Sequence, residues 1–243
     1  MTDATLLVAW REDAGWLGPG VVDLYMQQNS CSLLAEIEPL AHFPLNGVTI
    51  EDDVARLPDS KFHQCPARGL VLFISDPPAW EWYSFLNTLL DTAVQRCHVK
   101  QILTVGGVGS ATAHTTPRQI FTVSNSPQMS RILAKYDAAG ADHETQLGQR
   151  PSMNSYLLWL AQRRAIPAAS VWASVPFYLS GMQDAASWMR VAQFLEVYLG
   201  FGVDLAGPAQ KSDVLNQRIA EARVRNAELD EQIGKLERNQ SLS

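Results

Sequence analysis

The sequence predicts an α/β fold: a three-layer α/β/α sandwich built on a mostly parallel sheet. Two continuous apolar runs bounded by turn residues, at 69–75 and 101–105, are typical of strands buried on both faces. Strand patterns alternate with helix patterns along the chain, and this alternation indicates a sheet covered by helices on both sides. A chain of 243 residues with 47% apolar composition can bury a core of that kind.

Each element follows from its local pattern. Short apolar runs between turn residues predict strands, and longer runs with helical periodicity predict helices. Ser124, Asn125 or Ser126 is expected to cap the helix that follows them. In chain order we expect a strand at 5–10, a helix at 17–28, a strand at 32–37, an element at 43–51 with a turn at Asn46-Gly47, a solvated acidic loop at 51–59, strands at 69–75 and 101–105 around a helix at 80–97, a strand at 119–124, helices at 126–138 and 153–164, a strand at 168–174 and a helix at 184–199.

The C-terminal segment has the heptad spacing of a coiled-coil-type helix. Asn226 falls at an a-type position, where asparagine commonly fixes register and partner number. The helix either packs on its own domain or associates with another chain, and the sequence leaves both readings open. We divide the chain into an α/β/α domain, 1–205, and a C-terminal amphipathic helix with a short tail, 206–243. The seam is formed by Leu215, Ile219, Ala222, Asn226, Leu229, Ile233 and Leu236.

The composition limits the classes of function. A net charge of −6 argues against nucleic-acid binding, because phosphate contacts require a positive surface. Charged residues make up only 18% of the chain, which favours a compact fold with much internal or subunit-covered surface. No stretch approaches the roughly 18 apolar residues of a membrane span, and the first residues lack a signal-peptide pattern. We therefore expect a cytoplasmic protein with no membrane partner.

The cysteines Cys31, Cys65 and Cys97 are widely spaced and form no CxxC pair. Their spacing supports neither a zinc site nor a redox motif. We expect three reduced thiols, as is usual in a cytosolic protein. The histidines also lack metal-ligand spacing, so we expect no metal and no cofactor.

A glycine-rich loop after the strand predicted at 101–105 is the best candidate for a ligand site. Ligands of α/β sheets bind at the carboxyl ends of strands, and glycines let backbone N–H groups approach an anion closely. The loop matches neither the Rossmann nor the Walker spacing and leads into another strand, so a tight structural turn is an equal alternative. The candidate ligand-binding residues are Gly106, Gly107, Gly109, Ser110, His114, Thr115 and Thr116.

His114 stands beside several hydroxyl residues, which suggests acid–base chemistry. A triad with Ser110 would require an acid, and Asp76 at the end of the preceding predicted strand is the only candidate. Ser110 is not part of a G-x-S-x-G elbow, and a lone histidine near a turn usually satisfies local hydrogen bonds. The sequence therefore assigns no catalytic residue and favours a protein without enzyme activity, although it leaves that question open.

Aromatic residues gather at the start of the helix expected at 80–97. They cannot all face one core, and such clusters mark a subunit contact more often than a cofactor pocket. The candidate contacts with a partner or a second copy are Trp80 and Trp82, together with the tail residues Leu215, Ile219, Asn226, Leu229, Ile233 and Leu236.

Several segments, taken in order, resemble one known family. The chain has Asp13-Ala14-Gly15-Trp16 before its first helix, a Gly-rich run ending in His-Thr-Thr-Pro at 106–117, and Val175-Pro176-Phe177-Tyr178 before an apolar helix. Over roughly residues 5–205, this order resembles the proteasome assembly chaperone 2 family in its archaeal and bacterial branch, whose members were formerly labelled ATP-grasp-like.

The resemblance implies a purine-nucleoside-phosphorylase-like α/β/α fold, usually found in oligomers. Eukaryotic relatives help proteasome α-subunits assemble, and archaeal relatives interact with proteasome particles. The family offers no established catalytic residues, and the chain carries no ATP-binding signature. We therefore expect a non-enzymatic, homo-oligomeric protein-binding module whose partner is a proteasome-related or another protein assembly. The alternative is an enzyme or small-molecule binding protein that holds a phosphate- or nucleoside-like ligand at 106–116.

Two positions depart from the family pattern. Phe177 stands where many relatives have histidine, so chemistry attached to that histidine is not expected here. Archaeal proteasome-docking tails end in a hydrophobic residue, tyrosine and any residue, whereas this chain ends in Ser241-Leu242-Ser243. Direct docking on a proteasome by the C-terminus is therefore not expected.

Overall fold

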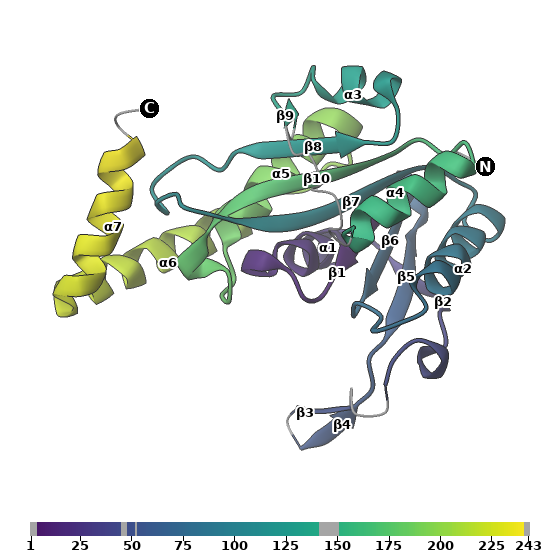
Figure 1. Cartoon of the computed structure of the whole chain (residues 1–243), viewed down its shortest axis with the longest axis horizontal. Coiled ribbons are helices and arrows are strands. Elements are labelled where there is room, and N and C mark those ends of the chain that lie inside the picture. The colour runs from purple at the N-terminus through teal and green to yellow at the C-terminus, as the bar shows by residue number, and fades with distance from the viewer. Residues whose placement is uncertain (1–3, 45–47, 52, 141–150, 241–243) are drawn as a thin grey trace.

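In the computed structural model, which describes residues 4–44, 48–51, 53–140 and 151–240, one sheet of eight strands runs through the molecule (Figure 1). In sheet order the strands are β2 (Ser32–Glu36), β5 (Ser60–Cys65), β6 (Leu70–Ser75), β1 (Ala4–Trp10), β7 (Val99–Ser110), β10 (Ala168–Pro176), β8 (Ile120–Ser124) and β9 (Ala139–Gly140). The four strands β6, β1, β7 and β10 are parallel to one another. Antiparallel pairs, β2 with β5, β5 with β6 and β10 with β8, lie toward the edges, so the sheet is mostly parallel as predicted.

Helices cover both faces of this sheet and form the three predicted layers (Figure 1). One core lies between the sheet and α1 (Leu17–Gln28) with α5 (Ala185–Leu199), and the other lies under α2 (Trp82–Gln95) and α4 (Met153–Arg163). Successive residues of a strand point to opposite faces, so β1 places Leu7 and Ala9 in the first core and Leu6 and Val8 in the second. Within the described residues, short 3-10 turns are η1 (Ala14–Trp16), η2 (Pro39–Ala41), η4 (Pro66–Arg68) and η5 (Phe177–Leu179).

Most predicted elements are confirmed, with shifted ends. Helix α3 (Pro127–Leu133) follows Ser126, whose hydroxyl accepts a hydrogen bond from the Met129 amide at 3.2 Å, so Ser126 is the cap among the three candidates. Strand β7 continues through Ser110, so the predicted glycine loop is part of a strand. The sequence pattern missed β5 because its polar residues, such as His63 and Gln64, interrupt the apolar run.

The acidic segment predicted as a solvated loop is instead a small hairpin. Strands β3 (Thr49–Glu51) and β4 (Val54–Arg56) pair antiparallel in a sheet of their own, which projects from the body of the molecule (Figure 1). The expected turn at Asn46-Gly47 lies outside the described residues. In the described parts of the chain, no helix has the length and apolar character needed to cross a bilayer.

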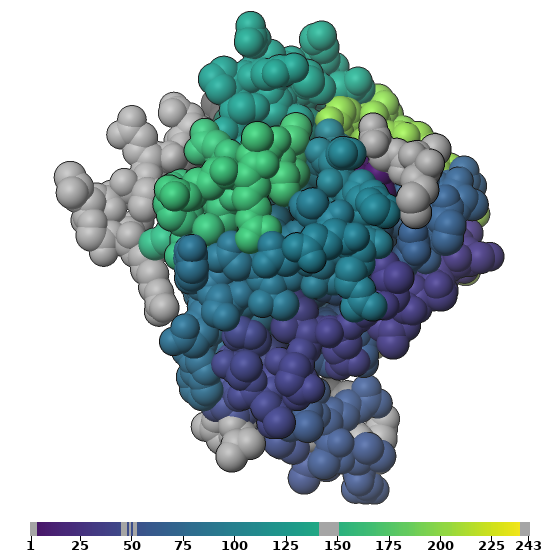
Figure 2. All heavy atoms as spheres, turned by 90° about the vertical axis from the view of Figure 1, so that its right-hand side faces the viewer, coloured from purple at the N-terminus to yellow at the C-terminus, as the bar shows by residue number. Residues whose placement is uncertain are grey.

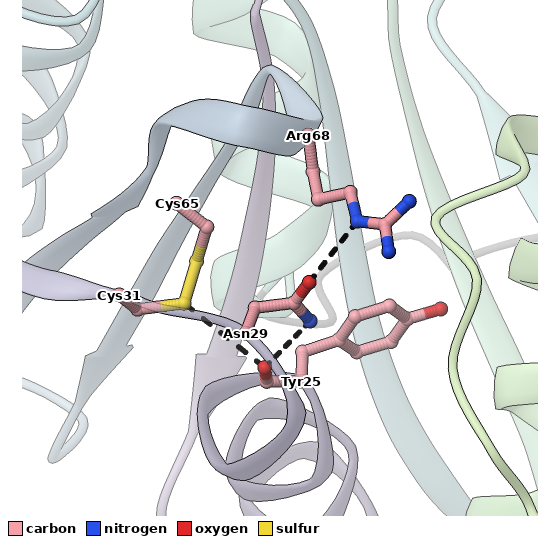
Figure 3. The surroundings of a disulfide bond; sticks show 5 residues. All are labelled: Tyr25, Asn29, Cys31, Cys65 and Arg68. Atoms are coloured by element: carbon pink, nitrogen blue, oxygen red, sulfur yellow. Dashed lines mark hydrogen bonds between the residues drawn. A yellow bond between two sulfur atoms is a disulfide. The ribbon is translucent and has the colours of Figure 1, made fainter.

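The expectation of three reduced thiols is wrong for two of the cysteines. Cys31 and Cys65 form a disulfide with a Cα–Cα separation of 4.3 Å, while Cys97 is free and buried (Figure 3). The register of the β2–β5 pair explains the bond: Ser32 lies opposite Gln64, so the two cysteines are the next pair along the ladder. Disulfides are rare in cytosolic proteins, so the thiols no longer support a cytoplasmic location, which stays a prediction.

The predicted single helix of the tail is two helices, α6 (Ala206–Arg225) and α7 (Ala227–Gln240), with a sharp bend at Asn226 (Figure 1). The backbone of Asn226 is extended, and its side-chain oxygen accepts hydrogen bonds from the Glu228 and Leu229 amides. Arg223 reaches Glu237, 14 residues further on, at 2.9 Å. In a straight helix these residues would be about 21 Å apart. Asn226 therefore caps α7 and is not an a-type residue of a continuous heptad seam.

The other seam residues pack within the chain. Ile219 and Ile233 are 9% and 1% exposed and join the core under α1 and α5. Leu215 and Leu229 pack against the same core, and Leu236 is half-buried. The reading in which the tail packs on its own domain is therefore the one found for these residues. The domain division at residue 205 and tail contacts with another chain stay predictions.

Candidate functional site

Asp13 links the start of α1 to β7. One carboxylate oxygen accepts a hydrogen bond from the Gly18 amide at 2.7 Å, and the other accepts one from the Gly107 amide at 2.8 Å. Burial raises the pKa of Asp13 from 3.8 to about 6, although these backbone hydrogen bonds oppose the shift. The carboxyl therefore fills the space next to the predicted glycine site with a group of the chain itself.

The glycines of β7 allow this close approach. A Cβ on Gly107 would lie 2.1 Å from the Ala14 carbonyl oxygen, and one on Gly106 would lie 3.2 Å from an Asp13 oxygen. A Cβ on Gly109 would meet only the Ser180 hydroxyl, at 3.5 Å. Gly106 and Gly107 are thus required for packing, whereas Gly109 has room beside it. Ligand binding by these residues stays a prediction.

Gly107→Ala is expected to destabilise the fold, whereas Gly109→Ala is expected to be nearly neutral. The first change forces a methyl group against a backbone oxygen, and overpacking of this kind costs roughly 1–3 kcal/mol. The second adds the same methyl group at an ordinary contact distance on the same face of the same strand. Urea unfolding of both variants measures the difference, and equal midpoints would contradict the packing role of Gly107.

Asp13 is expected to make stability depend on pH. Because folding raises the pKa of this carboxyl to about 6, the folded state holds its proton more tightly than the unfolded chain. The stabilisation is complete below about pH 4 and is lost as the pH rises through 6, by at most about 3 kcal/mol. Unfolding by urea at a series of pH values should show this fall in the wild type and not in Asp13→Asn.

The comparison with Asp13→Asn isolates this carboxyl from other titrating groups. Burial lowers the pKa of His42 and of His63. Because of such groups the free energy of unfolding decreases as the pH falls, which is the opposite trend. The asparagine amide would also face a backbone N–H, so the variant should carry a constant loss of about 1–3 kcal/mol. Parallel pH curves for wild type and variant would show that Asp13 does not titrate as described.

His114 is held by Tyr178 at the end of the sheet. The Tyr178 hydroxyl accepts a hydrogen bond from the His114 amide at 2.7 Å and lies 2.9 Å from the ring atom Nδ1. Having accepted from the amide, the hydroxyl can donate to Nδ1, which leaves the ring proton on Nε2. Burial lowers the pKa of His114, so the neutral ring is favoured. Asp76 instead pairs with Arg11 at 3.1 Å, so the acid considered for a triad is committed elsewhere.

The remaining loop residues contact nearby parts of the chain. The Ser110 hydroxyl lies 2.6 Å from that of Thr112 and 3.2 Å from the Val175 carbonyl. Thr115 donates to Glu237 of α7 at 3.4 Å. A cleft of about 520 Å³ lies between this loop and the bend of the tail, and is lined by His114, Thr115, Asn216, Ala220, Arg223, Val224 and Asp230.

A buried ion pair, missed by the sequence reading, holds this loop. Arg118 and Asp184 have side chains only 4% and 0% exposed, and they contact each other at 2.9 Å and 3.2 Å. Arg118 also donates to the carbonyl oxygens of His114 and Thr116 and to the Ser187 hydroxyl. Arg118 therefore fixes the loop to the start of α5. In the sequence, the features closest to a signal for this pair are a single arginine directly after the His-Thr-Thr-Pro run and a single aspartate directly before an apolar helix.

The predicted aromatic contacts separate into two groups. The Trp82 ring nitrogen donates to the Pro78 carbonyl at 2.8 Å, and its side chain packs against the core under α2. Trp80 and Tyr83 are 46% and 61% exposed, and Trp159 of α4 is 44% exposed. Helices α2 and α4 lie side by side on one side of the molecule (Figure 2). We use the name aromatic face for the three exposed aromatic residues of these two helices and of the segment just before α2, namely Trp80, Tyr83 and Trp159.

Trp159, in the aromatic face, has an aromatic and a cationic neighbour within its own helix. Trp159 stacks on Tyr156 with ring centroids 5.5 Å apart, and the guanidinium carbon of Arg163 lies 5.0 Å from the Trp159 ring. Tryptophan, tyrosine and arginine are the residues enriched at the energetic centres of interfaces. Among the described residues, no cluster of three or more His, Cys, Asp or Glu side chains is placed to hold a metal ion.

The fold places the chain among three-layer α/β/α proteins, and in this chain Asp13 fills the space beside the glycines of β7. The model of the PAC2 family matches residues 9–223, and the chain belongs to the PAC2 family. None of the curated proteins compared with the chain matches it.

Solved structures similar to this chain include proteins from bacteria and from archaea. A Corynebacterium glutamicum protein of unknown function has a TM-score of 0.81 and 17% identity, with 98% of this chain and 90% of that chain covered. The Mycobacterium tuberculosis proteasome-assembly chaperone homologue Rv2125 has a TM-score of 0.77 and 21% identity, with 94% of this chain and 99% of that chain covered. The Pyrococcus furiosus proteasome activator PbaB has a TM-score of 0.73 and 17% identity, with 92% of this chain and 94% of that chain covered. At these identities the similarity shows the fold.

Proposed function

We propose that the chain is a non-enzymatic, self-associating protein-binding module that assists the assembly of a proteasome or a comparable protein complex. Membership of the PAC2 family supports an assembly role, since its fold is shared with a proteasome-assembly chaperone homologue and a proteasome activator. The observation that carries the binding role is the aromatic face, where Trp80, Tyr83 and Trp159 are close to half exposed or more. Aromatic side chains of this size stabilise a complex strongly when a partner buries them.

Co-expression with the proteasome α-subunits of the same organism tests the proposal. We expect native mass spectrometry to show a complex of the chain with α-subunits, and Tyr83→Ala/Trp159→Ala to lose most of it, since interface aromatics commonly contribute more than about 2 kcal/mol each. Val197→Ala on α5, where Val197 is 71% exposed, is the matched surface control. Absence of any complex with α-subunits would contradict the proteasome part of the proposal.

The cleft between the 111–117 loop and the tail supports a second candidate function, small-molecule binding. Its volume of about 520 Å³ lies within the range of ligand pockets, and it contains His114 and Thr115 from the predicted site. A thermal-shift experiment with inorganic phosphate and with purine nucleosides tests this function. A ligand at about 100 times its Kd should add roughly 2.7 kcal/mol of stability. Ala220→Phe, which places a large side chain among the residues that line the cleft, should abolish the shift.

A further inference from the structure

One face of the β3–β4 hairpin carries apolar side chains at each of its described positions. Opposite residues of an antiparallel pair share a face, which places Ile50 with Ala55, and alternation adds the flanking residues Val48 and Leu57. Val48, Ile50 and Leu57 are 41%, 77% and 53% exposed, and Ala55 is exposed as well. We call these four residues the arm face. A two-stranded hairpin with an exposed apolar face is only marginally stable in water, so this face is suited to burial against a partner.

The tip of the same hairpin is acidic. Asp53 lies at the turn between the strands, where its side chain is exposed and its backbone has a left-handed φ of 62°. The arm therefore combines an apolar face with a negative tip, and a complementary surface would be an apolar groove with a positive rim.

Such a groove lies where α6 crosses α5. It has a volume of about 740 Å³ and is lined by apolar side chains from three parts of the chain, among them Trp16, Met182, Trp188 and Val214. Trp16 and Met182 are 49% and 50% exposed, whereas Trp188 is almost buried. Exposed tryptophan and methionine are residues that interfaces concentrate at their centres. We call this surface the α5–α6 groove.

The charges of the α5–α6 groove are positive. Lys211 and Arg218 of α6 line it, and no aspartate or glutamate is among the described residues that do so. The Lys211 ammonium lies 5.6 Å from the centre of the Trp188 ring, so charge and apolar surface are adjacent. This is a local reversal in a chain whose net charge is −6.

The chain also maintains Trp16 in an unfavourable backbone conformation at this groove. Trp16 has a φ of 50°, a left-handed value that costs a bulky residue free energy. The turn before it is fixed from three sides: the Gly15 amide donates to the Ser180 carbonyl, and the Gly15 carbonyl accepts from the Asp184 amide and the Trp188 ring nitrogen. Strain held in place by the surrounding structure is typical of binding surfaces.

We propose that the arm face of one copy of this chain docks into the α5–α6 groove of a second copy, with the acidic tip against Lys211 and Arg218. The inference rests on the self-association included in the proposed function. The arm and α6 lie on different parts of the molecule, and the arm projects away from the sheet (Figure 1). Residues of α6 line the groove. Two different patches give a head-to-tail interface, which closes into a ring or continues as a filament.

Substitutions on the two faces of the hairpin test the apolar contact. Ile50→Asp places a charge on the arm face, and Val54→Asp places the same charge on the opposite face of the same hairpin, where Val54 is 57% exposed. We expect light scattering of the full chain to show an oligomer for wild type and Val54→Asp, and a dissociation constant raised on the order of a hundredfold for Ile50→Asp. Circular dichroism of all three proteins should be the same, because neither position supports the main core.

A charge exchange tests the polar contact and identifies the groove. Asp53→Lys or Arg218→Glu alone should weaken assembly on the order of tenfold by bringing like charges together, and the double variant should recover it. Recovery in the double variant requires the two residues to meet across the interface. A photo-reactive residue at position 50 should also cross-link to a peptide of the α5–α6 groove within a species of twice the chain mass.

The outcomes separate this inference from the proposed function. If the wild type assembles and Ile50→Asp, Asp53→Lys and Arg218→Glu all assemble equally well, the arm–groove contact is wrong while self-association stands. If the wild type is a monomer at every concentration, both self-association and this contact are wrong. Binding to α-subunits through the aromatic face is measured separately and depends on neither result.

Discussion

Asp184→Ala is expected to lower the free energy of unfolding by about 3–5 kcal/mol, the largest effect of any single substitution considered for this chain. The Asp184 side chain is 0% exposed and is bonded to Arg118 through both carboxylate oxygens. Its removal leaves the guanidinium of Arg118 buried without a counter-charge, while the bonds from Arg118 to two carbonyls and to Ser187 cannot neutralise it. Urea unfolding followed by circular dichroism measures the loss.

An exposed pair of the same chemistry is the matched control. Arg190 pairs with Asp137 at 2.8 Å, but the Asp137 side chain is 94% exposed. Surface pairs of this kind contribute at most about 1 kcal/mol. Alanine at the left-handed φ of Asp137, 55°, costs roughly 1 kcal/mol more, so Asp137→Ala should still lower stability clearly less than Asp184→Ala. The double variant Arg118→Met/Asp184→Leu should be more stable than Asp184→Ala, because it removes both buried charges. Equal losses for Asp184→Ala and Asp137→Ala would refute the importance of burial.

The ion pair also shows why the sequence predicts the loop at 111–117 as a candidate site but does not predict Arg118 and Asp184, which hold the loop in position. The His-Thr-Thr-Pro run and its glycines are contiguous and carry a recognisable composition. Arg118 and Asp184 are 66 residues apart, and their contact depends on β10 and α5 returning to the loop. Asp13 is a similar case, since its bond to Gly107 joins residues 94 positions apart. Local patterns identify candidate segments, whereas the partners of a buried polar group depend on tertiary structure.

The central sheet could be predicted because its strands carry their own signal. Strands β6 and β7 contain segments that are buried on both faces, so their apolar runs are continuous and bounded by turn residues. Strand β5 alternates polar and apolar residues near the sheet edge, and the residues of β4 are exposed, so neither strand has the pattern of a buried element. The tail shows the reverse error: its spacing fits a continuous heptad seam, but the capping preference of Asn226 prevails and bends the chain.

The disulfide is the other feature that depends on tertiary structure, and its position gives it consequences beyond β2. Cys31 and Cys65 are separated by 34 residues, and the segment they enclose contains β2 and the whole β3–β4 hairpin. The bond joins the edge strand to β5 next to Tyr25, whose carbonyl accepts from the Asn29 side chain (Figure 3). Both ends of the segment that carries the arm are therefore fixed to the sheet by one covalent bond.

Reduction of this bond is expected to lower the free energy of unfolding by about 3–4 kcal/mol, since a cross-link over a segment of this length removes that much chain entropy from the unfolded state. Urea unfolding with and without a phosphine reductant measures the loss. Cys31→Ala/Cys65→Ala should match the reduced wild type and should not respond to the reductant, whereas Cys97→Ala should still respond. An unchanged wild-type midpoint under reductant would contradict the bond. If the arm also carries assembly, the loss of its anchor should weaken the oligomer in the same range of reductant, which links the stability of an edge strand to the association of copies.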